Sequence, residues 1–158
     1  MYLVDFGADR AVQVLDWNTM DIDWQGRGWD RGLRGIAFDG EVVFIAASDE
    51  LFAYSPDFAL LGSWRNRYLK HCHEIYRHER TLFLTSTGFD SILAFDLDRK
   101  DFVWGLCIAA EGDAFIGRPF DPGFDDGPAA SNALHLNSVH CERGGMVWRP
   151  GRPAARHR

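Results

Sequence analysis

The chain has 158 residues and a mass of 17.9 kDa, with 46% hydrophobic and 25% charged residues, which is ordinary for one globular domain and too apolar for intrinsic disorder. Its formal net charge of -6 argues against a nucleic-acid-binding protein, because such a protein needs a basic surface to meet the phosphate backbone. No apolar run approaches the roughly 20 residues of a membrane helix, and three cysteines are too few for a disulfide scaffold, so we expect no membrane contact and a reducing, cytoplasmic setting.

The first predicted elements lie in residues 1–30. Residues 3–6 and 12–17 are short stretches rich in apolar side chains, as is typical of β-strands. We interpret them as the outer strands of a partial structural unit that precedes the repeat described next.

Residues 31–68 and 69–108 are two copies of one pattern, offset by about 40 residues. Each copy contains four short stretches in which apolar residues alternate or run together, separated by Asp, Gly and Ser, which predicts four strands joined by turns. A repeat of this length with four strands is typical of a β-propeller blade. The aligned stretches are 34–48 with 73–87, 49–54 with 90–95, and 58–64 with 102–108.

The rest of the chain contains a loop, a further partial blade and a tail. Residues 109–133 are rich in Gly, Pro and Asp and are predicted to form a long loop. Residues 134–148 begin another blade, and residues 149–158 are predicted to form a disordered basic tail. The predicted fold is therefore all-β, with about two complete and two partial blades of four antiparallel strands within residues 1–148. Because propellers typically have 4–8 blades, we expect an incomplete ring.

The repeat also predicts a functional site. His71 and His73 stand two positions apart and would share one strand face. His135 aligns with His71, Asn137 aligns with His73, and Arg34 is the equivalent of His73 in the preceding blade. The first strand of each propeller blade lines the central channel, so these five side chains are predicted to be neighbours at the channel mouth.

Three chemical interpretations of this cluster remain open. A guanidinium and protonated imidazoles suit a small polar or anionic ligand. Imidazole nitrogens also suit a divalent metal, with His71, His73 and His135 as ligands and Glu74 as a general base, although strand alternation puts Glu74 on the face opposite His73. The polar groups also suit a water-filled channel with no ligand. The cysteines lack metal-site spacing and are predicted to fill the apolar core.

Residues 69–75 and 82–97, together with the His-Leu-Asn element at 135–137, resemble a largely uncharacterised family of bacterial β-propeller proteins with NHL- or quinoprotein-like repeats. The resemblance covers residues 31–148 and implies the propeller fold but no settled activity. Members of that family are longer and have more blades. This chain ends inside the blade that Asn137 opens, so the resemblance implies a truncated member.

The sequence therefore favours a β-propeller binding module that recognises a small polar or anionic ligand, or a protein partner, at the channel mouth. One alternative is a metal-assisted lyase or hydrolase that uses the channel histidines. Another is a truncated gene product without independent function. Exposed blade edges would also favour a homo-oligomer.

Overall fold

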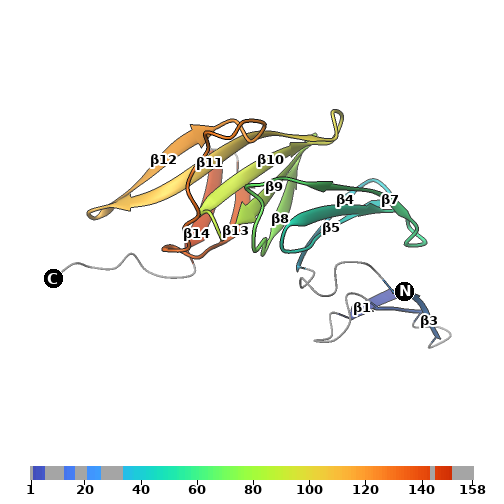
Figure 1. Cartoon of the computed structure of the whole chain (residues 1–158). Coiled ribbons are helices and arrows are strands. Elements are labelled where there is room, and N and C mark those ends of the chain that lie inside the picture. The colour runs from blue at the N-terminus through green and yellow to red at the C-terminus, as the bar shows by residue number, and fades with distance from the viewer. Residues whose placement is uncertain (1, 6–12, 17–20, 26–33, 143–144, 151–158) are drawn as a thin grey trace.

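The computed structural model describes residues 2–5, 13–16, 21–25, 34–142 and 145–150 (Figure 1). This part of the chain consists of β-strands and the loops between them, and it contains no helix, hence none long and apolar enough to cross a membrane. At the N-terminal end, β1 (Tyr2–Asp5), β2 (Gln13–Asp16) and β3 (Asp21–Gln25) form an antiparallel three-stranded sheet in chain order. The two strands predicted within residues 1–30 are thus present, and a third follows them.

The two predicted repeats form two antiparallel sheets, which we call blades A and B. Blade A contains β4 (Arg34–Asp39), β5 (Val42–Ala46), β6 (Glu50–Tyr54) and β7 (Leu60–Arg65). Blade B contains β8 (Ile75–His78), β9 (Thr81–Ser86), β10 (Ser91–Asp96), β11 (Asp101–Glu111) and β12 (Ala114–Phe120). Blade C contains β13 (Leu136–Glu142) and β14 (Gly145–Pro150).

Local sequence explains why these segments are strands. β5 is rich in β-branched and aromatic residues, and β6 is buried along its whole length, as expected for a strand packed on both faces. Gly40 and Glu41 turn the chain between β4 and β5, and Gly40 takes the positive φ of 60° that such a hairpin turn requires.

The first strands of successive blades are neighbours, as they are around a propeller axis. β4 contacts β8, and β8 contacts β13. A core shared by blades A and B fills the space between their sheets, with the Phe95 ring 5.1 Å from that of Trp64 in blade A and 5.1 Å from that of Phe102. The prediction of β-propeller blades built from antiparallel strands is confirmed. That the ring is incomplete stays a prediction.

Equivalent residues connect each blade to the next. Ser48 follows β5 in blade A, and its Oγ accepts a hydrogen bond from the backbone N–H of His71 at 3.1 Å, while its carbonyl accepts one from Cys72 at 3.1 Å. Thr87 is the aligned residue in blade B, and its hydroxyl donates to the Leu136 carbonyl at 2.5 Å. The repeat therefore reproduces a connection between blades as well as the strands within them.

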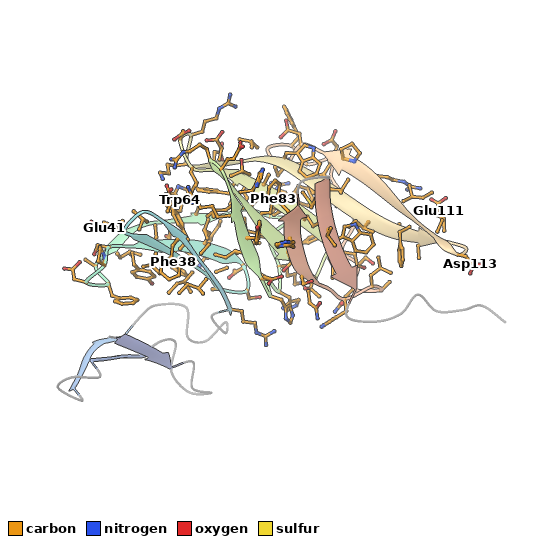
Figure 2. The ribbon with its side chains drawn as sticks, turned by 180° about the vertical axis from the view of Figure 1, so that it is seen from behind. Phe38, Glu41, Trp64, Phe83, Glu111 and Asp113 are labelled. Carbon is orange, nitrogen blue, oxygen red and sulfur yellow. The ribbon has the colours of Figure 1, made fainter. Side chains whose placement is uncertain are left out.

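The predicted loop at 109–133 is wrong over its first part. β11 continues to Glu111, Gly112 turns the chain at a φ of 62°, and β12 pairs back along β11, so blade B has five strands rather than four. Figure 2 shows Glu111 and Asp113 at the protruding end of this hairpin, far from Phe38 and Trp64 of blade A.

Tertiary contact explains the hairpin. The Phe115 ring lies 5.1 Å from that of Trp148 in β14. β12 therefore packs against the next blade, and this contact cannot be predicted from the sequence of β12 alone. The predicted tail is also wrong at its start, because β14 runs through Pro150. The rest of that tail lies outside the described residues.

Candidate functional site

A cavity of about 430 Å³ opens beside the first strands of blades A, B and C. We call it the three-histidine pocket. Its lining includes the imidazoles of His71, His73 and His135. The guanidinium of Arg34, the side chains of Ser48, Thr87 and Asn132, and Cys72 complete the described lining. The described residues that line the pocket include no carboxylate. The pocket is therefore basic, although the chain as a whole is acidic.

Arg34 and His73 form the centre of the pocket. Nη1 of Arg34 lies 2.9 Å from Nδ1 and 3.1 Å from Nε2 of His73, and the His73 ring meets the His135 ring edge-on at 5.3 Å. Thr85 holds the backbone at this point, because its Oγ1 accepts hydrogen bonds from the N–H groups of His73 at 3.1 Å and Glu74 at 3.0 Å. A guanidinium and two imidazoles are thereby fixed together at the meeting point of three blades.

His71 and His135 have the same unusual backbone conformation. Both have a φ of 54°, in the left-handed region that non-glycine residues rarely adopt and that is enriched at functional sites. Nδ1 of His135 donates to Oδ1 of Asn132 at 2.9 Å, which leaves Nε2 available as an acceptor in the neutral ring. Nδ1 of His71 lies 3.3 Å from Oγ of Ser48. The aligned histidines are therefore equivalent in conformation as well as in sequence.

The environment of His73 disfavours its protonated form. Partial burial lowers the pKa of His73 below its ordinary value of 6.5, and the charges of Arg34, His135 and His71 lower it further. As the pH falls below about 6.5, the unfolded chain binds a proton at this histidine more readily than the folded chain does. The free energy of unfolding is therefore expected to decrease as the pH falls through this range.

We predict that the His73 ring titrates with a midpoint below 6.5 in a proton NMR titration. Arg34→Gln should move this midpoint upward, because it removes a neighbouring positive charge. Arg118→Gln is the matched control, since Arg118 pairs with Glu111 on the β11–β12 hairpin and should leave the midpoint unchanged. A wild-type midpoint at or above 6.5 would contradict the prediction.

The Cys72 thiol and the Glu74 carboxylate, which lie next to His73 in the chain, have structural roles. Burial raises the pKa of the Cys72 thiol to about 12, so the thiol is neutral at ordinary pH and is a poor nucleophile. Oε2 of Glu74 accepts a hydrogen bond from the backbone N–H of Val139 in β13 at 2.9 Å, and Glu74 is not in the described lining of the pocket. Glu74 thus joins blades B and C and does not stand where the predicted general base would be needed.

The metal site predicted at His71, His73 and His135 stays a prediction. Within the residues that the structure describes, no three His, Cys, Asp or Glu side chains are grouped so as to hold a metal ion. The Arg34 guanidinium lies against His73 and would repel a cation there. The imidazoles of His71, His73 and His135 border one pocket, but their arrangement does not favour a shared metal.

Asn137 was predicted to be part of the site, but it is not among the described residues that line the pocket. The pairing of β13 with β14 shifts register between Leu136 and Ser138, and His135 has a positive φ, so the alternation expected for an extended strand does not hold here. His71 and His73 also precede β8 and share no strand face. Sequence reasoning missed Ser48, Thr87 and Asn132, although the repeat aligns the first two and offered a signal for them.

Comparisons with known proteins identify no family. No protein-family model matches the chain, and no curated protein matches it. The family resemblance within residues 31–148 therefore stays a prediction beyond the β-propeller fold itself. Among solved structures, the WD40 domain of Neurospora crassa Pan2 is similar, with a TM-score of 0.47 and 10% sequence identity. The match covers 77% of this chain and 46% of that domain, so the chain spans less than half of its length.

Proposed function

We propose that this chain is a β-propeller binding module that takes a small anionic ligand in the three-histidine pocket. The observation that carries the proposal is the pairing of Arg34 with His73 in a cavity whose described lining contains no carboxylate. A guanidinium is always charged and binds carboxylates and phosphates with directed hydrogen bonds. The pocket thus offers an anion a positive charge that the described lining does not neutralise.

The other lining groups complement such a ligand. The imidazoles of His71, His73 and His135 present ring nitrogens, and the hydroxyls of Ser48 and Thr87 and the amide of Asn132 supply neutral polar groups. A bound anion also stabilises protonated His73, so ligand binding and proton uptake reinforce each other. Affinity should consequently rise as the pH is lowered through the titration of His73.

The experiment uses inorganic phosphate as the probe and isothermal titration calorimetry as the measurement. We expect Arg34→Gln to weaken phosphate binding about tenfold or more, since a hydrogen bond to a charged group contributes about 1.5–3 kcal/mol. Arg118→Gln carries the same change of charge outside the pocket and should bind phosphate as the wild type does. The pH comparison uses sulfate, whose charge does not change between pH 5.5 and pH 7.5, and sulfate should bind the wild type more tightly at pH 5.5.

Two results would overturn this function. In the first, phosphate does not bind the wild-type chain. In the second, Arg34→Gln and Arg118→Gln bind phosphate equally well, so that the pocket is not the site.

A further inference from the structure

A second hollow adjoins the three-histidine pocket. It has a volume of about 480 Å³ and shares Ser48 with the pocket, so one residue borders both spaces. Its lining contains three basic residues, Arg65, Arg67 and Lys70, and one carboxylate, Asp49, and we call it the basic hollow. Lys70 and His71 are consecutive in the chain, yet the first lines the basic hollow and the second lines the pocket. The two spaces are thus adjacent.

The positive charges of the basic hollow differ in how far they are neutralised. Nη2 of Arg65 lies 2.8 Å from Oε2 of Glu50, a carboxylate whose side chain is only 9% exposed, so this guanidinium is held in place. Arg67 pairs with Asp125, but both side chains are largely exposed, and such a pair is weak in water. In the described part of the chain no carboxylate forms an ion pair with Lys70. An incoming anion therefore meets Lys70 and Arg67, together with the Asp49 carboxylate that also lines the hollow.

The backbone under these charges is fixed before any ligand arrives. The N–H of Lys70 donates to Oγ of Ser86 at 3.0 Å, and its carbonyl accepts from the N–H of Gly88 at 3.0 Å. The next residue, His71, is held by Ser48. The aliphatic stem of Lys70 packs so closely on Gly88 that a Cβ on this glycine would lie 2.9 Å from the Lys70 Cγ. A preorganised segment loses less entropy when a ligand binds to it.

We infer that the pocket and the basic hollow form one continuous site for an extended small molecule with at least two anionic groups. The first group binds at Arg34 and His73, and the second binds at Lys70 and Arg67. This inference rests on the proposed function and extends it from a single anionic group to a ligand class. Condensed phosphates and dicarboxylates share the required chemistry, and the test separates the two.

The test compares probes with one and several anionic groups. Linear tripolyphosphate should bind the wild-type chain at least tenfold tighter than orthophosphate. Lys70→Gln should remove this advantage and leave the affinity for orthophosphate unchanged, while Lys70→Arg should retain it. Arg118→Gln changes the net charge equally and should leave the advantage intact, which controls for general electrostatic attraction. Circular dichroism establishes that each variant is folded.

A second pair of probes identifies the anionic group. Tighter binding of succinate than of acetate, with the same dependence on Lys70, assigns the site to dicarboxylates. An advantage seen only for tripolyphosphate assigns it to condensed phosphates.

The outcomes that contradict the inference are distinct from those that contradict the proposed function. If orthophosphate binds through Arg34 but Lys70→Gln and Arg118→Gln weaken tripolyphosphate equally, the continuous site is wrong and the proposed function stands. If orthophosphate does not bind the wild type, both are wrong.

Discussion

Replacing Gly35 by alanine is expected to lower the free energy of unfolding by about 3 kcal/mol, measured by urea denaturation. Gly35 has a φ of 69°, and a Cβ at this position would lie 2.8 Å from the backbone nitrogen of Ile75 and 3.1 Å from backbone atoms of Glu74. Because these atoms belong to the backbone of the next blade, β4 and the start of β8 would have to separate. The same displacement should move Arg34 away from His73 and weaken phosphate binding.

Gly40→Ala is the matched control for this prediction. Gly40 has a similar φ of 60°, but nothing lies within 4 Å of the position a Cβ would take. Its substitution should cost only the backbone strain of about 1–2 kcal/mol and should leave phosphate binding unchanged. If the two variants lost equal stability, the close approach of the blades at Gly35 would add nothing to the cost of a side chain there, and the prediction would be wrong.

Replacing Asp90 by alanine is expected to lower the free energy of unfolding by about 3–5 kcal/mol, again measured by urea denaturation. The Asp90 residue is 2% exposed, and its carboxylate accepts three hydrogen bonds from the segment before β13. Oδ2 accepts from the Ser131 hydroxyl at 2.7 Å and the Ala133 N–H at 2.7 Å, and Oδ1 accepts from the Leu134 N–H at 3.2 Å. Truncation would leave these donors without the acceptor that fixes the segment.

This loss should extend to the pocket, because the segment that Asp90 holds carries Asn132 and leads directly into His135. We expect Asp90→Ala to shift the NMR signals of His135 and weaken phosphate binding. Asp90→Asn is the matched variant, since asparagine tolerates the φ of 44° and keeps one carbonyl acceptor, and it should cost about 1–2 kcal/mol. A loss below about 1 kcal/mol in Asp90→Ala would contradict the structural role of this carboxylate.

Much of the site followed from aligning the repeats. Arg34, His73 and His135 were predicted to be neighbours because equivalent positions of successive blades meet near one axis, and the structure places them in one pocket. Asn137 was predicted with them but is absent from the described lining, because the register shift in β13 breaks the alternation on which that prediction depended. Asn132 was missed because it lies in a segment without repeat or strand pattern.

The sequence by itself determined the blades. Alternating apolar residues and Asp/Gly turns are local signals, and they specify strand and hairpin wherever the chain lies. Their repetition then determined that blades A and B are equivalent and that Ser48 and Thr87 occupy matching positions.

Only the tertiary structure decided which side chains share the pocket and which hold it together. The fifth strand of blade B depends on packing against Trp148, and the position of His135 depends on hydrogen bonds to Asp90 from residues distant in sequence. The hydrogen bond from the Val139 N–H to the Glu74 carboxylate likewise joins residues that are distant in the sequence. These contacts join groups far apart in the chain, and their geometry depends on left-handed residues and a register shift that no periodic pattern encodes.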